Sequence, residues 1–150
     1  MTQKPYRYAG CGLDWVYLLD GYDVHETPYG CGVSVRDADG LHEAIAQEIV
    51  TSHHPIRGQE MRFLRSILDV SQDGMGKMIG LSRVQVSRCE NKPDEAVSGS
   101  VDRALRMLFG LREQKPDLIE RILEVLTEID AQEHEPATFT GTHFGWAKAA

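Results

Sequence analysis

Basic side chains gather in the middle of this sequence, where they could bind phosphate. Residues 56–92 carry seven basic and four acidic side chains, a net charge of +3, whereas the other residues carry nine basic and nineteen acidic ones, a net charge of −10. Exposed charges are screened from one another beyond roughly 8–10 Å at physiological salt. The negative charge of the other residues therefore does not prevent this segment from binding phosphate locally. Its basic residues are Arg57, Arg62, Arg65, Lys77, Arg83, Arg88 and Lys92.

A second candidate chemistry is metal binding by Cys11, His25 and Cys31. The Cys-Gly pairs at 11–12 and 31–32 resemble half of a zinc knuckle, repeated twice. A structural zinc site usually needs four ligands with paired Cys-x-x-Cys spacing, and neither cysteine has such a partner. We therefore predict no metal and no cofactor, and we expect the cysteines to be small turn or core residues.

Enzymatic chemistry has no motif to support it. The six histidines and many carboxylates form no nucleophile elbow, phosphate loop or metal-hydrolase pattern. We therefore predict a protein that is not an enzyme.

The basic segment is predicted to form three short helices. Gln59–Leu68 has apolar residues on one face at helical spacing. Ser71 is a plausible N-cap of a second helix, and Ser82 of a third, because a serine hydroxyl can accept a bond from a free N–H of the first turn. Gly80-Leu81 forms the turn between them. Two short helices joined by a tight turn with glycine are typical of a helix-turn-helix, whose second helix can enter a DNA major groove.

Within residues 58–92, five groups of residues resemble the Xre/Cro-like repressor family in order and spacing. They are Val70-Ser71-Gln72, Met75-Gly76, Ile79-Gly80-Leu81-Ser82, Val86-Ser87 and Glu90-Asn91. Cys89 and Lys92 depart from the family pattern, in which a larger apolar residue and a glycine are usual.

This resemblance implies a role for individual residues in contacting DNA. It places Arg83, Val84 and Arg88 against bases, with Gln85 as a further candidate, and it places Gln72, Ser82 and Asn91 against the DNA backbone. An arginine fork can pair with O6 and N7 of guanine together, which is worth about 1–3 kcal/mol of discrimination, and a valine can contact a thymine methyl group. The resemblance also implies a partly buried salt bridge between Arg65 and Glu90, so that Arg65 has a structural role.

Residues 1–54 are predicted to form a small antiparallel β-sheet covered by one helix. The expected strands are Trp15–Leu19, Tyr22–Thr27 and Gly32–Val35. The Asp20-Gly21 pair between the first two strands is a strong hairpin signal, since both turn positions need positive φ. The helix should span Ala38–Thr51, with Asp37 or Asp39 as its N-cap.

The order of these parts is similar to that of MqsA/YgiT-type antitoxins, in which a small N-terminal domain precedes a helix-turn-helix. That domain carries zinc on paired cysteines in the antitoxins, and the pairs are absent here. The similarity implies a protein toxin as a partner.

Two more helices are expected after a loop at residues 92–99. The first begins at Ser98 or Ser100, and the last runs from Leu118 to about Ala131 with Asp117 as its cap. The last helix has more apolar residues than one buried face requires, so we expect it to fill the core and also a subunit interface. The tail from Glu133 is either disordered or a docking arm.

Composition agrees with a globular protein, with 41% hydrophobic and 26% charged residues. No apolar run approaches the roughly 20 residues needed to cross a bilayer. The N-terminus lacks the apolar stretch of a secretory signal, and three widely spaced cysteines give no disulfide framework. We therefore expect a cytoplasmic location and no membrane association.

Together these observations predict an α+β protein with three parts. They are a β-sheet-plus-helix domain at 1–54, an all-α five-helix domain at 55–132 and a tail at 133–150. The expected function is sequence-specific binding of double-stranded DNA by a homodimer, as a repressor at a palindromic operator, with a toxin as a further partner. The alternatives are a stand-alone ligand-sensing regulator and a helical protein-interaction module that does not bind DNA.

Overall fold

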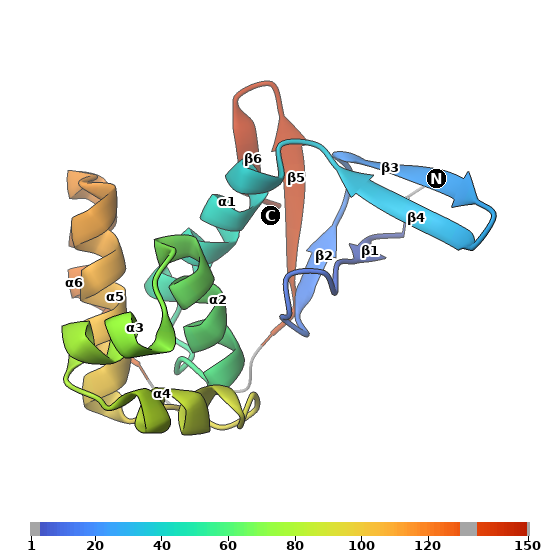
Figure 1. The fold of residues 1–150 in the computed structure, drawn as a ribbon. Helices are drawn as coiled ribbons and strands as arrows, with labels where there is room; N and C mark the ends of the chain where they lie inside the picture. The colour runs from blue at the N-terminus through green and yellow to red at the C-terminus, as the bar shows by residue number, and fades with distance from the viewer. Residues whose placement is uncertain (1–3, 130–134, 150) are drawn as a thin grey trace. The chain divides into compact units, whose positions relative to one another are not determined.

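The computed structural model describes residues 4–129 and 135–149, and it combines helices with two small sheets (Figure 1). The chain divides into two compact units, residues 1–45 with 135–150 and residues 46–134. Six helices occur in the described residues, α1 and the five that follow it. The expected α+β class is therefore confirmed. The expected boundaries lie after residues 54 and 132. The observed boundary instead lies after residue 45, inside α1, and residues from both ends of the chain belong to the same unit.

Four strands form the main sheet of the first unit, in the order β1 (Tyr6–Arg7), β2 (Val16–Leu18), β5 (Ala137–Thr142) and β6 (Gly145–Lys148). β2 pairs antiparallel with β1 and parallel with β5, so the sheet is mixed and not antiparallel as expected. Val16, Leu18 and Phe139 are completely buried. The described part of the expected tail is thus not disordered, because it forms β5 and β6 and its Phe139 is part of this core.

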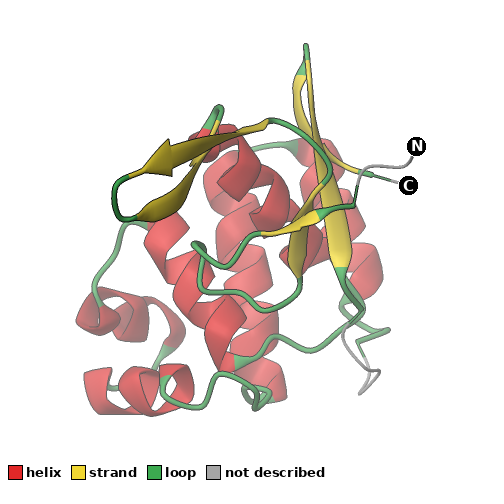
Figure 2. Ribbon diagram, turned by 90° about the vertical axis from the view of Figure 1, so that its right-hand side faces the viewer, coloured by secondary structure: helices red, strands yellow, loops and turns green. Residues whose placement is uncertain are grey.

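β3 (Tyr22–Thr27) and β4 (Gly30–Val35) form a separate two-stranded sheet, coloured yellow with the other strands in Figure 2. The expected hairpin across Asp20-Gly21 is wrong. β1 and β5 occupy the two edges of β2, which leaves no edge for β3. The Asp20 carboxylate instead accepts from the Gly141 N–H at 2.7 Å. The tight hairpin loop lies farther along, at residues 28 and 29 between the paired Thr27 and Gly30.

Helix α1 (Ala38–Thr51) has the bounds that the sequence predicts. Asp37, in a left-handed conformation with φ 49°, caps it by accepting from the Gly40 N–H at 3.2 Å. Leu41 and Ile45 are completely buried. His42 lies 3.0 Å from the Tyr8 hydroxyl, and burial lowers the pKa of His42 below its usual value. The neutral imidazole is therefore the form that this environment favours.

After α1, the described residues of the second unit form five helices, α2 (Gly58–Leu68), α3 (Gln72–Ile79), α4 (Arg83–Glu90), α5 (Gly99–Glu113) and α6 (Pro116–Val125). Helix α5 packs against α2, α3 and α6. Completely buried side chains from every one of these helices form the core, namely Met61, Leu64, Met75, Val86, Leu105, Phe109 and Ile122. This apolar centre holds the shorter helices α3 and α4 in place.

The last helix is shorter than expected. Pro116 occupies its first turn and Lys115 is its N-cap, in place of Asp117. A proline suits the first helical position because the missing N–H would have no partner there. The helix ends at Val125, and the expected end at Ala131 lies outside the described residues. Of its surplus apolar residues, Leu123 is 52% exposed.

A buried arginine on α5 binds the segment that connects α1 to α2. Arg106 is completely buried, and its Nε donates to Asp102 at 2.6 Å. Its remaining nitrogens donate to the carbonyls of Val50, Ser52 and His54 at the end of α1. A cation is favourable at a helix C-terminus, where carbonyls lack helical partners. These bonds tie the end of α1 to α5 and explain why the division between the units falls within α1.

Candidate nucleic-acid interface

Serine caps set the starts of α3 and α4. The Ser71 hydroxyl accepts from the Gly74 N–H at 3.0 Å. The Ser82 hydroxyl accepts from the Gln85 N–H at 3.1 Å, and the Gln85 side-chain oxygen accepts from the Ser82 N–H at 2.8 Å. This reciprocal pair is a capping box, which satisfies two N–H groups that the helix itself leaves free. Both caps agree with the positions predicted from the sequence.

The turn between α3 and α4 depends on two glycines. Gly80 ends α3 with φ 81°, a conformation that side chains other than glycine rarely adopt. A Cβ on Gly76 would lie only 2.3 Å from the Leu81 carbonyl oxygen. The absence of a side chain at 76 therefore lets the turn close tightly onto α3, and this closeness sets how α4 leaves the turn.

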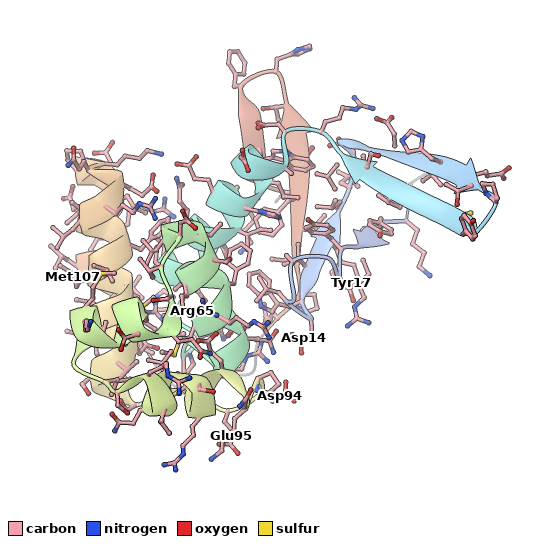
Figure 3. All side chains as sticks on the ribbon, in the orientation of Figure 1. Asp14, Tyr17, Arg65, Asp94, Glu95 and Met107 are labelled. Atoms are coloured by element: carbon pink, nitrogen blue, oxygen red, sulfur yellow. The ribbon has the colours of Figure 1, made fainter. Side chains whose placement is uncertain are left out.

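An ion pair joins α2 to the end of α4. The Arg65 guanidinium donates to both carboxylate oxygens of Glu90, with Nη2–Oε1 at 2.8 Å, and it also donates to the Val70 carbonyl at 3.2 Å. Arg65 is labelled in Figure 3. The Glu90 side chain is only 3% exposed. The pair that the resemblance implied is present, and Arg65 is occupied by contacts within the protein.

The residues expected to contact bases lie together on the exposed side of α4. Arg83, Val84 and Arg88 are exposed, while Val86 on the same helix is completely buried. Val84 is 48% exposed, because two positions along a helix place it on the opposite side of α4 from Val86. Helix α4 therefore presents two guanidinium groups and one aliphatic group to its surroundings.

The residues expected to contact the DNA backbone flank this surface. Ser82 and Asn91 are exposed at the two ends of α4. Gln72, at the start of α3, is half-buried, and its amide nitrogen lies 3.5 Å from Glu90. Gln85 is exposed, but its side-chain oxygen is already used in the capping box, which leaves its amide N–H groups as donors.

Charge pairing distinguishes the two α4 arginines from nearby lysines. Lys77 pairs with Asp73 at 3.0 Å, and Lys92 approaches Glu95 at 3.7 Å. Within residues 4–129 and 135–149, neither Arg83 nor Arg88 has an ion-pair or hydrogen-bond partner for its side chain. Both guanidinium groups are thus available to an external acceptor.

A hollow of 170 Å³ lies at the end of α4. Arg88, Lys92 and Ser98 line it together with Cys89 and Glu95. Two cationic side chains and a hydroxyl at its edge provide donors beside the exposed side of α4. The hollow therefore extends the basic surface beyond the helix itself.

Cys11, His25 and Cys31, the candidate metal ligands, lie in the first unit. Among the residues that the structure describes, no three His, Cys, Asp or Glu side chains gather as a metal site. Cys11 donates to the Tyr8 carbonyl at 3.5 Å, and burial raises the pKa of its thiol. His25 and Cys31 are exposed on β3 and β4. The structure therefore does not bring Cys11, His25 and Cys31 together as ligands.

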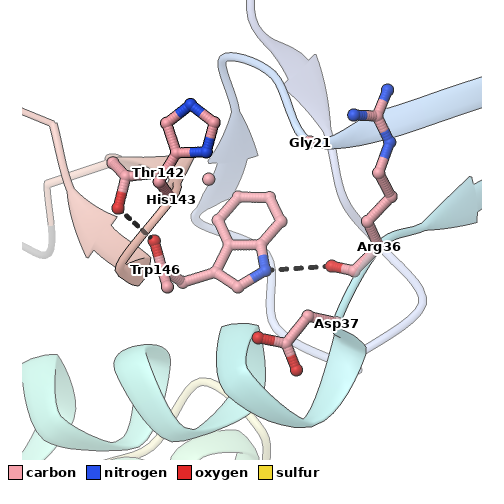
Figure 4. A pocket seen from close by; sticks show the side chains of 8 residues that line it. Gly21, Arg36, Asp37, Thr142, His143 and Trp146 are labelled. Atoms are coloured by element: carbon pink, nitrogen blue, oxygen red, sulfur yellow. Dashed lines mark hydrogen bonds between the residues drawn. The ribbon is translucent and has the colours of Figure 1, made fainter.

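A larger hollow of 280 Å³ in the first unit is formed by packing around Trp146 (Figure 4). The indole N–H donates to the Arg36 carbonyl at 3.0 Å. A Cβ on Gly21 would lie 2.4 Å from the indole ring. The lack of a side chain at Gly21 and the hydrogen bond to the Arg36 carbonyl are therefore both explained by the packing of the Trp146 ring.

Sequence reasoning missed the buried pair of Asp102 and Arg106. Both residues lie on the same helix four positions apart, alongside the buried Leu105 and Phe109. A charged pair at this spacing on an apolar face was the available signal. An exposed helical ion pair has the same spacing in the sequence. The two cases differ only in whether other parts of the protein cover the pair, and the sequence did not reveal that the segment after α1 covers this one.

Comparison with known proteins finds no matching family model, no matching curated protein and no matching solved structure. None of the described helices combines the length and the apolar character that crossing a bilayer requires.

Proposed function

We propose that this protein is a sequence-specific DNA-binding regulator in which α3 and α4 act as a helix-turn-helix. The observation that carries the proposal is the exposed side of α4, where Arg83 and Arg88 have no side-chain partner among the described residues and Val84 is open to solvent. Arginine forks suit guanine edges, and an aliphatic group suits a thymine methyl group. The resemblance of residues 58–92 to Xre/Cro-like repressors points to the same helix.

The roles of the flanking residues follow from their positions. Ser82 and Asn91 would contact phosphates on either side of the bases that α4 reads, and Gln72 would do so from the start of α3. Gln85 retains only its amide N–H groups for a base, since its oxygen caps α4. Arg65 takes no part in base contacts, because Glu90 and the Val70 carbonyl hold it.

Two copies would bind a palindromic operator, because a helix-turn-helix reads one half-site and two half-sites lie about 34–36 Å apart. The repressor role is taken from the resemblance of residues 58–92 to Xre/Cro-like repressors. A stand-alone regulator that senses a ligand, and a helical interaction module without DNA binding, are the rival functions. The proposed function involves no enzymatic activity.

One observation favours a protein partner as a second function. The first unit carries four basic and eight acidic side chains, a net charge of −4. A basic protein would be attracted to such a surface, and like charges would be repelled. The similarity in domain order to MqsA/YgiT-type antitoxins suggests a toxin as that protein.

The test begins by selecting bound sequences from a random duplex library with the full-length protein. Fluorescence anisotropy then measures Kd for the selected duplex and for a scrambled one. We expect Arg83→Ala and Arg88→Ala each to weaken specific binding by roughly 5- to 150-fold, corresponding to about 1–3 kcal/mol. Arg7→Ala is the matched control, because it removes the same charge from an exposed position in the first unit.

Salt dependence separates this function from the interaction module. Several phosphate contacts predict that log K falls with log salt by about 0.9 for every phosphate neutralised. Failure of the selection to enrich any sequence, together with an affinity independent of salt, would overturn the proposal. Equal losses in the Arg7 and Arg83 variants would show that only net charge matters.

A further inference from the structure

The outer edge of β4 is open. Within the described residues β4 pairs only with β3, over six residue pairs from Tyr22–Val35 to Thr27–Gly30 (Figure 1). An unpaired edge presents a row of backbone N–H and C=O groups, which can template pairing with another chain. A ribbon of two strands is also marginally stable by itself in water. Both properties favour a further strand beside this hairpin.

The sequence of β4 does nothing to protect that edge. Proteins usually block an open edge with a charged residue, a proline or a bulge. β4 reads Gly-Cys-Gly-Val-Ser-Val and contains neither a charge nor a proline, and its register with β3 is uninterrupted. β3, in contrast, carries Asp23, His25 and Glu26. The two edges of the hairpin therefore differ, and only the β4 edge suits close approach by another strand.

Gly32 gives independent support, because its own chain does not require a glycine there. Its φ lies outside the left-handed region, and a Cβ at this position would meet nothing within 4 Å. Gly30, by comparison, has φ 119° at the tight turn and is explained by it. A glycine in the interior of a strand lowers its stability and often marks a place where another backbone comes close.

Exposed apolar groups lie beside the same edge. Val24 and Val33 are register partners, and they are 60% and 36% exposed. Tyr29 at the turn is 99% exposed. Strand addition at β4 would extend the sheet next to Val33 and bring apolar side chains of the added strand onto the same face.

We propose that β4 pairs antiparallel with β4 of a second copy of this chain, so that two hairpins form one four-stranded sheet. Antiparallel pairing of identical strands is self-complementary about a two-fold axis. The uncharged β4 places no like charges opposite each other, whereas pairing of two β3 edges would place acidic residues together. Because β4 carries no charge, a charged strand gains no attraction at this edge, whereas an identical uncharged strand meets no repulsion there.

The contact is small for a dimer interface. A standard interface buries about 800 Å² on each partner, which is more than one pair of six-residue strands provides. The association is therefore reversible and depends on protein concentration. It does not rest on DNA binding, and an inactive α4 would leave it intact.

The test measures association of the full-length protein by sedimentation velocity over a range of concentrations. Gly32→Lys adds a charge to the β4 edge where the protein's own packing leaves open space. His25→Lys is its matched control, because His25 is the register partner of Gly32 on β3 and receives the same charge. We expect Gly32→Lys to raise the dimer Kd at least tenfold and His25→Lys to leave it within about twofold. Thermal unfolding checks that both variants are folded.

Cys31 provides a local readout, since it is exposed on β4 next to Gly32. Its alkylation rate, followed by peptide mass spectrometry with Cys89 as the internal reference, should fall as protein concentration rises and should not fall in Gly32→Lys. A monomer at all concentrations would overturn the proposal. So would a dimer whose Kd is the same in Gly32→Lys, because its interface must then lie elsewhere, for example at the exposed Leu111 and Leu123.

Discussion

Charged side chains with little or no solvent contact hold the second unit together at several points. Glu90 at the end of α4 binds Arg65, and Asp102 on α5 binds Arg106 while also accepting from the Ile56 N–H at 2.7 Å. A buried carboxylate without its partner leaves an uncompensated charge, which is far more costly than losing an exposed pair. These residues are therefore structural, and their burial contrasts with the exposure of Arg83 and Arg88.

Replacing Arg65 tests this distinction at the scale of one residue. We expect Arg65→Ala to lower the free energy of unfolding by about 3–5 kcal/mol, because Glu90 would be left buried and unpaired. The measurement is urea unfolding followed by circular dichroism. Arg62→Ala, on the same helix but exposed, should change stability by no more than about 0.5 kcal/mol. An Arg65→Ala variant of unchanged stability that no longer binds DNA would instead make Arg65 a DNA contact.

At the scale of elements, the geometry of α3, its turn and α4 depends on how closely the turn approaches α3. The Leu81 N–H donates to the Gly76 carbonyl at 2.8 Å, while the Leu81 carbonyl occupies the space where a Cβ on Gly76 would be. Glycine usually lowers helix stability relative to alanine. Its presence at 76 is therefore explained by tertiary packing and not by helix propensity.

Gly76→Ala should consequently destabilise the protein despite the better helix propensity of alanine. We expect a loss of about 1–3 kcal/mol, typical of overpacking, when unfolding is measured in urea. Gly99→Ala is the control, because a Cβ there would meet only the movable end of the Arg103 side chain, and its effect should be under about 1 kcal/mol. If both variants proved equally stable, the turn would not require this close approach.

At the scale of the whole molecule, the two ends of the chain form one unit. Phe139 near the C-terminus is completely buried, its ring lies 6.5 Å from that of Trp15, and β5 pairs with β2. Both tryptophans of the protein, Trp15 and Trp146, belong to this unit. Tryptophan fluorescence therefore reports on the first unit specifically.

Truncating Phe139 should weaken the first unit strongly. We expect Phe139→Ala to lower the free energy of unfolding detected by tryptophan fluorescence by about 3–5 kcal/mol, the usual cost of removing a buried phenylalanine. Phe144→Ala is the matched control, since Phe144 is fully exposed at the β5–β6 turn. A tryptophan signal that unfolds at the same denaturant concentration in both variants would contradict the role of the C-terminal strands in this core.

Local chemistry determined several helices and their caps from the sequence alone. The serine caps at 71 and 82, the bounds of α1 and the apolar spacing of α2 depend on neighbours within a few residues, and these features agree with the structure. The exposed basic face of α4 follows from the same local spacing. Its use in reading DNA stays a prediction, which the variants at 83 and 88 address.

Only the tertiary structure decided the arrangement of the first unit. Asp20-Gly21 has the sequence of a hairpin turn, yet β2 pairs with β5, whose residues lie more than a hundred positions later in the chain. Turn propensity acts between neighbouring residues, whereas the choice of strand partner depends on which apolar surfaces can be buried together. The same reason explains Arg106, because its burial depends on the carbonyls at the end of α1, which lie more than fifty residues away.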